Sequence, residues 1–227
     1  MGYLQKVDYK IAHSEEDRSI IYRLRYDAYI REEAIKPHPS MMFHDDYDDL
    51  ENCWIFSLSI DEQLVSSVRV HVISPEHPKG PALDVFPDIV GPMVFEQGCT
   101  IIDPTRFVAS PEFAAEYPEL PYFTLRAAFM AVDYYNADYC LATVRKEHMA
   151  FYRRVFRAEI LSEPRPYPSL QKPIAIMCVD VPKVRNKIAR RYPIFESSFT
   201  ERRFIFNKPD TIPENKKPPV LVSSLAS

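Results

Sequence analysis

The stretch 102–108, Ile-Asp-Pro-Thr-Arg-Phe-Val, is the one around which the rest of this chain can be arranged. Its apolar ends are those of a buried strand, yet it carries an acid and an arginine three residues apart. In a regular strand Asp103 and Arg106 would lie on opposite faces, because side chains alternate. Pro104 has no amide proton for a sheet ladder, so the stretch predicts a bulge or an edge strand. A bulge would direct both charged groups into one cleft; the alternative is a surface acid and arginine at a strand end.

The 227-residue chain has 46% hydrophobic and 26% charged residues, which is typical of a soluble globular α/β protein. The four cysteines are widely spaced and include no CxxC pair, so they predict buried thiols of a cytoplasmic protein and not a disulfide framework or a zinc site. The first residues lack the apolar core of a signal peptide, and no run of 18 apolar residues predicts a transmembrane segment. No nucleic-acid-binding motif is present.

Hydrophobic periodicity predicts an order of strands and helices. Ser14 is a candidate N-cap for the first helix, and the two apolar runs around residues 61–63 predict an antiparallel hairpin. The predicted strands are 3–11, 53–60, 64–73, 99–109, 139–144 and 174–181, and the predicted helices are 14–30, 122–136, 147–156 and 182–191. Three segments read as irregular connections: 35–52, 74–98 and 110–121.

This order predicts an α/β (α+β) fold with a mixed, mostly antiparallel central sheet and helices on both faces. It is the order found in GNAT-type acyltransferases. We expect one domain over residues 1–203, followed by a proline-rich C-terminal arm over 204–227.

Four short motifs resemble the autoinducer-synthase branch of the GNAT superfamily. That branch contains acyl-homoserine-lactone synthases and long-chain N-acyl amino acid synthases. The motifs are Leu-Arg-Tyr-Asp-Ala-Tyr at 24–29, Asp-Asp-Tyr-Asp at 45–48, Ser-Ser-Val-Arg at 66–69 and Asp-Pro-Thr-Arg-Phe at 103–107. They are similar, in order, to the family's helix arginine followed by an aromatic residue, its D-E-Y-D, its G-S-x-R and its E-x-S-R-F.

Departures from these motifs favour one of the two kinds of enzyme in this branch. Asp103 stands where the family has Glu, and the tryptophan that follows the first helix in lactone synthases is absent. Residues 151–156, Phe-Tyr-Arg-Arg-Val-Phe, resemble the Y-x-x-x-G-F ending of N-acyl amino acid synthases, with Val155 in place of glycine. The resemblance is therefore closest to N-acyl amino acid synthases, and it implies an enzyme that forms an amide between a fatty acyl thioester and the amine of an amino acid.

The reaction would need a base and an oxyanion site. The attacking amine must lose a proton, so a carboxylate, or a water that it orders, acts as the base; Asp103 is the candidate. Backbone N–H groups near residues 107–109, from Phe107 and Val108 onward, would hold the oxyanion if the strand splays there.

The acceptor's carboxylate would need a cation. A planar guanidinium is its natural bidentate partner, and Arg25, Arg69 and Arg106 are the candidates. Asp45 and Asp48 either contact the acceptor's ammonium group or pair with these arginines, and pairing is the preferred alternative. The resemblance implies that all these charged residues form one network with the base.

Two features bear on the acyl donor. The segment before the helix at 122–136 has no glycine, so it lacks the usual cradle for the pyrophosphate of CoA. An acyl carrier protein would not need that cradle, and such carriers are acidic. Residues 145–203 hold 14 Lys and Arg against 6 Asp and Glu. The candidate docking residues are Arg145, Lys146, Arg153, Arg154 and Arg157; a solvated basic helix is the alternative. Acyl-CoA remains the other possible donor, and no tightly bound cofactor is expected.

The remaining candidates have ordinary alternatives. Phe129 and Thr143 are candidate substrate-binding residues along an acyl tunnel, although core packing explains Phe129 as well. His148 is either a base or a surface histidine, and His44 has no suitably spaced partner for a metal, so no metal site is expected. Two other functions stay open: a homoserine-lactone synthase that uses S-adenosylmethionine, and a GNAT-like acyl-binding module without catalytic activity.

Overall fold

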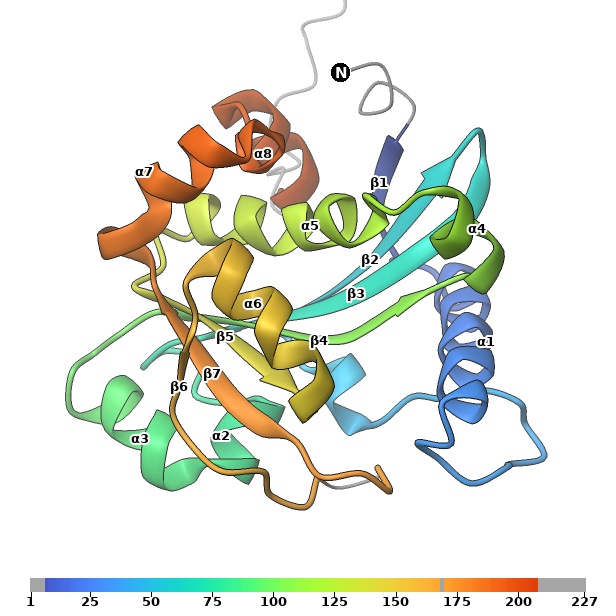
Figure 1. Ribbon diagram of the computed structural model, residues 1–227, viewed down its shortest axis with the longest axis horizontal. Coiled ribbons are helices and arrows are strands. Elements are labelled where there is room, and N and C mark those ends of the chain that lie inside the picture. Colours follow the sequence, from blue (N-terminus) through green and yellow to red (C-terminus); the bar gives the residue numbers. More distant parts are fainter. Residues whose placement is uncertain (1–6, 168–169, 208–227) are drawn as a thin grey trace, which may run out of the picture.

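The structure is a computed structural model that describes residues 7–167 and 170–207. Seven strands form one sheet in the order β1-β2-β3-β4-β5-β7-β6 (Figure 1). The strands are β1 Val7–Ile11, β2 Cys53–Ile60, β3 Gln63–Ile73, β4 Ile101–Ala109, β5 Tyr139–Val144, β6 Glu159–Ile160 and β7 Ala175–Asp180. Every neighbouring pair is antiparallel except β4 and β5, which confirms the predicted mixed, mostly antiparallel sheet.

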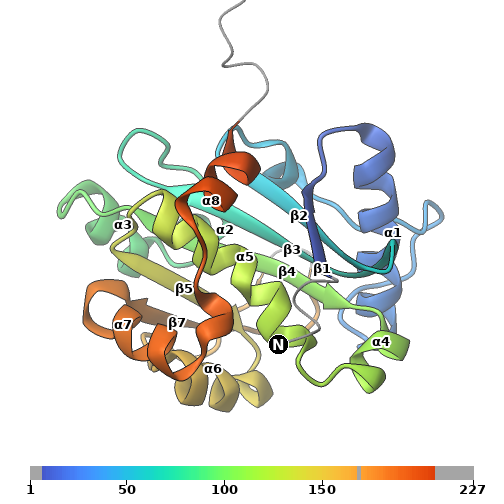
Figure 2. The same cartoon turned by 90° about the horizontal axis from the view of Figure 1, so that it is seen from above.

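Helices cover both faces of the sheet. Figure 1 shows α5, α7 and α8 above the sheet and α2 and α3 below it. The α-helices are α1 Glu15–Arg31, α2 Pro81–Val85, α3 Pro87–Phe95, α4 Pro111–Glu116, α5 Leu120–Tyr134, α6 Met149–Phe156, α7 Val181–Arg191 and α8 Phe199–Phe206. Three 3₁₀ helices are η2 Asp46–Asp49, η3 Lys146–His148 and η4 Pro193–Phe195. In Figure 2, α5 lies across the middle strands, beside α8.

The side-chain alternation of the strands separates two cores. Val68, Val70 and Val72 of β3 face the core beneath α5, α6, α7 and α8. Ile73 and Ile101 face the opposite core, beneath α2 and α3. Helix α1 covers the same side as α2 and α3. Its predicted cap is present, because Ser14 Oγ accepts from the Asp17 amide at 3.1 Å and the Asp17 carboxylate accepts from the Ser14 amide at 3.3 Å.

A β-bulge interrupts β4 where the sequence predicted one, although not at the proline. The ladder with β3 pairs Ser67 with Val108 and Arg69 with Thr105, so two residues of β4, Arg106 and Phe107, face one residue of β3. Arg106 has φ +52°, in the left-handed region. Pro104 stays in the ladder, opposite Val70. The bulge rotates the Arg106 side chain onto the face that already carries Asp103 and Thr105.

Beside the bulge the sheet opens. The parallel pairing of β4 with β5 is limited to Ile101 with Tyr139 and Ile102 with Cys140. Beyond that point β5 continues along β7, while β4 continues along β3, and the two strands diverge in Figure 1. The residues of β4 that follow Ile102 therefore have no ladder partner among the described residues on the β5 side.

Two segments predicted to be irregular contain helices, and proline explains both. Residues 74–98 contain α2 and α3, and residues 110–121 contain α4; each helix has proline at its first turn, where the missing amide proton costs nothing. The predicted domain boundary at 203 falls inside α8, whose Phe206 is buried against Trp54 and Phe56. The predicted arm beyond Asn207 lies outside the described residues.

In the described part of the chain, no helix is both long and apolar enough to cross a membrane.

Candidate active site

Five of the predicted charged residues form a continuous chain of ion pairs beneath α1. Arg25 Nη1 donates to Asp48 Oδ1 at 2.7 Å, and Arg69 Nη1 lies 3.2 Å from the same oxygen. Arg69 Nη1 also donates to Asp45 Oδ1, and Arg106 Nη2 donates to Asp45 Oδ2. The side chains of Arg25, Arg69 and Asp48 are at most 1% exposed. Asp45 and Asp48 therefore pair with the arginines, as the preferred alternative predicted.

The sequence at 45–48 explains why two carboxylates reach the same place. Asp45 caps η2: its Oδ1 accepts from the Tyr47 amide at 3.2 Å, and Asp48 Oδ2 accepts in return from the Asp45 amide at 3.0 Å. This reciprocal capping box fixes the turn and directs both carboxylates toward the sheet. Two further bonds hold η2 in position, one from Arg18 to Asp49 and one from the Tyr47 hydroxyl to Asp84.

The ion-pair chain carries a surplus of positive charge, with three guanidinium groups against two carboxylates. Burial by itself would raise the pKa of Asp45, but Arg69 and Arg106 outweigh it and hold that pKa at about 2. The pKa of Asp48 is lowered in the same way, against its burial, by Arg25 and Arg69. Arg25 Nε, Arg25 Nη2 and Arg69 Nη2 have no hydrogen-bond acceptor among the described residues. Buried donors without an acceptor, together with net positive charge, are suited to an anionic ligand.

Aromatic rings surround the guanidinium of Arg106, and the sequence did not single them out. Its central carbon lies 4.4 Å from the ring centre of Phe43, 5.5 Å from that of Tyr29 and 5.7 Å from that of Tyr167. Such contacts stabilise a desolvated guanidinium. Tyr29 lies one helical turn after Arg25, so helical spacing offered a signal for it; the contact with Tyr167 depends on tertiary packing alone.

Asp103 lies on the same face but outside the ion-pair chain, so the expectation of one network that includes the base was wrong. Its side chain is fully buried, and Oδ2 accepts from the Ala82 amide at 3.2 Å. Burial raises the pKa of Asp103 to about 6, although the Ala82 amide and Arg69 lower it. The physical reason for the separation is the direction of Arg69: its Nε donates to Thr105 Oγ1 at 3.0 Å, which turns the guanidinium toward η2.

Phe107 is the second residue of the bulge and Val108 follows it, and neither pairs with β5. The Phe107 side chain packs in the core beneath α5, whereas Val108 is held to β3 by its carbonyl, which accepts from Ser66 Oγ at 2.7 Å. β4 and β5 diverge beside these two residues, and that their amides hold an oxyanion stays a prediction. Thr143, half-buried on β5, lies on the other strand of the diverging pair.

Phe129 is a core residue. It is 6% exposed, and its ring lies 4.7 Å from that of Phe195 and 5.1 Å from that of Phe156. These rings belong to a tightly packed cluster between α5, α6 and η4. The core alternative thus describes Phe129, and the tunnel alternative does not.

The predicted docking residues divide into two groups. Arg145 is tied to the end of α1, because it donates to Glu32 at 2.9 Å and lies 3.3 Å from Glu147. His148 contacts the same guanidinium at 3.0 Å, and burial together with Arg145 lowers its pKa. The other four basic residues are exposed on and around α6: Lys146, Arg153, Arg154 and Arg157.

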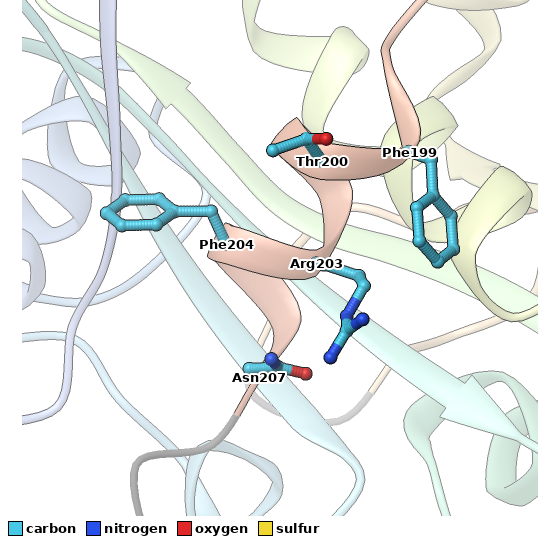
Figure 3. A pocket seen from close by; sticks show the side chains of 5 residues that line it. All are labelled: Phe199, Thr200, Arg203, Phe204 and Asn207. Carbon is cyan, nitrogen blue, oxygen red and sulfur yellow. The ribbon is translucent and has the colours of Figure 1, made fainter.

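Two surface hollows of the described residues lie elsewhere. One, of about 370 Å³, is on α8, where Figure 3 shows Phe199 and Arg203 on one side of the helix and Phe204 on another. The second, of about 430 Å³, lies where β2 and β4 begin, between Trp54 and Tyr135. Neither includes a candidate residue. Within the described ranges no group of three His, Cys, Asp or Glu residues could hold a metal ion, and the four cysteines are free.

Comparison with known proteins identifies a family. Residues 20–180, which hold all four motifs, match the family described as N-acyl amino acid synthase FeeM. A direct comparison with the sequences of curated proteins finds no significant match.

Solved structures with the same fold agree with that family. The N-acyl amino acid synthase FeeM from uncultured soil microbes has a TM-score of 0.61 at 14% identity, over 79% of this chain and 93% of that one. The CoA-dependent acyl-homoserine lactone synthase MesI has a TM-score of 0.56 at 18% identity, over 84% and 97%. An acyl-CoA N-acyltransferase from Pseudomonas aeruginosa has 0.51 at 17%, over 76% and 99%. At these identities the structures show the fold alone, and they confirm that it is GNAT-like.

Proposed function

The chain belongs to the N-acyl amino acid synthase FeeM family and is an N-acyltransferase, and from this premise we propose that it joins a fatty acyl thioester to the amine of an amino acid. The observation that carries the choice of acceptor is the buried surplus of positive charge beside Asp103. An amino acid has an anion and a nucleophilic amine a few bonds apart. The same face of β3 and β4 carries both the buried cations and the candidate base.

The acceptor's carboxylate would bind at the arginines. Arg25 and Arg69 have N–H groups without an acceptor, and their guanidinium planes match a carboxylate. Asp45 and Asp48 hold these arginines in place, so we assign them to the construction of the site. The guanidinium group of Arg106, held between the aromatic rings described above, is the third cation of this carboxylate site.

The acceptor's amine would react at Asp103. With a pKa of about 6, this carboxyl is mostly ionised at neutral pH and still basic enough to take a proton, directly or through a water. The amine nitrogen attacks the thioester carbon, and the proton that it loses passes to Asp103. Amides of β4 near residues 107–109 that face away from β3 would hold the tetrahedral oxyanion. The carbon–sulfur bond then breaks, and the sulfur leaves as a thiol after receiving a proton.

The thioester would lie where β4 and β5 stop pairing, with Thr143 beside it. We propose acyl carrier protein as the donor, with acyl-CoA as the alternative. The connection before α5 has no glycine and begins α4 with Pro111, which leaves few amides for a pyrophosphate. The exposed cations of α6 fit an acidic carrier. The four free cysteines fit the reducing cytoplasm, where we expect the reaction to take place.

The test supplies both donors. The protein is incubated with acyl carrier protein thioesters or acyl-CoA and a mixture of amino acids, and the products are identified by mass spectrometry. We expect N-acyl amino acids. The formation of an acyl-homoserine lactone together with methylthioadenosine would identify a homoserine-lactone synthase instead. The absence of any amide from either donor, with folded protein, would contradict the proposal.

Asp103→Asn is the matched variant. It keeps the shape of the side chain but removes the base, so kcat should fall by about 10²- to 10⁴-fold. Circular dichroism should be unchanged, because an amide fits a buried site at least as well as a carboxylate does. An Asp103→Asn enzyme as active as the wild type would show that another group takes the proton.

A further inference from the structure

A buried histidine lies directly beside Asp103. His71 of β3 and Asp103 of β4 are partners in the antiparallel ladder, so their side chains project from the same face. Directly opposite residues have Cβ atoms about 4.5–5.5 Å apart. Both side chains are fully buried. None of the four sequence motifs includes His71, and the reaction described so far does not use it.

The hydrogen bonds of His71 determine which of its ring nitrogens carries the proton. Nε2 lies 2.9 Å from the Tyr47 carbonyl oxygen, which can only accept, so Nε2 is the donor. Burial and the neighbouring charge of Arg69 lower the pKa of His71 to about 3, so the ring is neutral. Nδ1 therefore has a lone pair, and it has no hydrogen-bond partner among the described residues.

Asp103 also has a polar atom without a hydrogen-bond partner in the described part of the chain. Its Oδ2 is occupied by the Ala82 amide, but Oδ1 is buried and has no partner in the described structure. A buried polar atom without a hydrogen-bond partner destabilises the folded state. When Asp103 carries a proton on Oδ1, it becomes a donor, and His71 Nδ1 is an acceptor on the adjacent strand. One proton would then satisfy both atoms.

We infer that His71 is a positioning residue for the acid–base step: its Nδ1 accepts the hydrogen bond that Asp103 donates once Asp103 has taken the proton of the acceptor amine. This inference rests on the proposed role of Asp103. The proton moves from the amine nitrogen to Asp103 Oδ1 as the carbon–nitrogen bond forms. It is shared with Nδ1 while the carbon–sulfur bond breaks, and it then passes to the leaving sulfur, which departs as a thiol. His71 returns to its starting state.

His71 and Asp103 together bind one proton, because the surrounding groups disfavour the binding of a second proton. Arg69, on the same strand, disfavours a charged imidazolium, and the charge of Asp103 acts on two further buried groups, the hydroxyl of Tyr167 and the thiol of Cys140. Asp45 and Asp48 of η2 favour the charged ring only weakly, since burial and Arg69 prevail. Coupled groups of this kind titrate as a pair.

Two substitutions separate the two nitrogens of the ring. His71→Gln keeps an N–H donor near the position of Nε2 for the Tyr47 carbonyl but has no acceptor at Nδ1. His71→Asn keeps an acceptor near Nδ1 but loses the donor. In His71→Gln the acid limb of the kcat profile should move to lower pH by about one unit, because protonated Asp103 loses its acceptor. Its kcat should fall about tenfold with KM unchanged. His71→Asn should keep the wild-type limb.

A measurement without turnover distinguishes failure of this inference from failure of the proposed function. Carboxyl ¹³C shifts of the full-length protein, with the Asp103 signal assigned from Asp103→Asn, give the pKa of Asp103 directly. It should be lower in His71→Gln than in the wild type and close to the wild type in His71→Asn. Equal pKa values in the wild type and His71→Gln would overturn the inference, whether or not the enzyme makes an amide. An inactive wild type with the expected shift would overturn only the proposed function.

Discussion

Arginines occupy two regions of this molecule in opposite surroundings. Arg25 and Arg69 are fully buried beneath α1 and reach carboxylates of η2, whereas Arg153 and Arg154 lie exposed on α6. A buried charge must be compensated within a few ångströms, since a low-dielectric interior penalises it heavily. An exposed charge is compensated by water and salt. The comparison predicts that changes in the first region affect stability and catalysis together, and that changes in the second affect only encounters with a partner.

The largest effect is expected from Asp48→Asn. The substitution leaves Arg25 and Arg69 facing a neutral amide in a buried site, which should lower the free energy of unfolding by about 3–5 kcal/mol. Urea denaturation measures this change. Asp46→Asn is the matched control, because Asp46 lies on the same turn but is exposed, and its effect should stay within about 0.5 kcal/mol. Equal effects of the two variants would mean that the buried pairs contribute no more than surface charges.

A smaller effect is expected from acid. The pKa of Asp45 is lowered to about 2 in the folded protein from 3.8, so its pairing stabilises the fold above pH 4 and is lost as the pH falls toward 2. Its contribution is on the order of 1–2 kcal/mol. The difference in unfolding free energy between wild type and Asp45→Asn should therefore shrink over that range. A difference that is constant from pH 6 to pH 2 would contradict the ion pairing.

The titration of Asp103 should change the folding stability with pH in the opposite direction. Its folded pKa of about 6 lies above 3.8, so the folded state binds the proton more tightly, and stability should fall as the pH rises from about 4 to about 6. Asp103→Asn should remove this slope. Denaturation midpoints of both proteins across that range measure it, and identical slopes would show that the buried carboxyl titrates as an exposed one does.

The smallest effect on stability is expected on α6. Arg153→Glu with Arg154→Glu should change the free energy of unfolding by no more than about 0.5 kcal/mol for each residue. If an acidic carrier docks there, KM for the carrier thioester should rise several-fold and become less sensitive to salt, while KM for acyl-CoA stays the same. Arg203→Glu on α8 is the control for charge alone. An unchanged KM for the carrier thioester would place docking elsewhere.

The same contrast explains which features of the structure could be predicted from the sequence. The strands of the hairpin were predicted to within a residue, and the bulge in β4 was predicted from an acid, a proline and an arginine in a buried run. These features are local, since they depend on side-chain alternation and on backbone chemistry. Proline was misleading where it starts a helix, as at Pro81 and Pro87.

The sequence by itself supplied the four motifs, and their resemblance to a known family implied that Arg25, Asp45, Asp48, Arg69 and Arg106 belong together. Only the tertiary structure decided which of the charged residues contact one another. It set Asp103 apart, since Thr105 turns Arg69 away, and it placed His71 beside that carboxyl through the register of β3 and β4. It also brought Tyr167 to Arg106 from a distant segment. Pattern fixes which face a side chain takes, but distances between side chains of different strands and helices depend on packing.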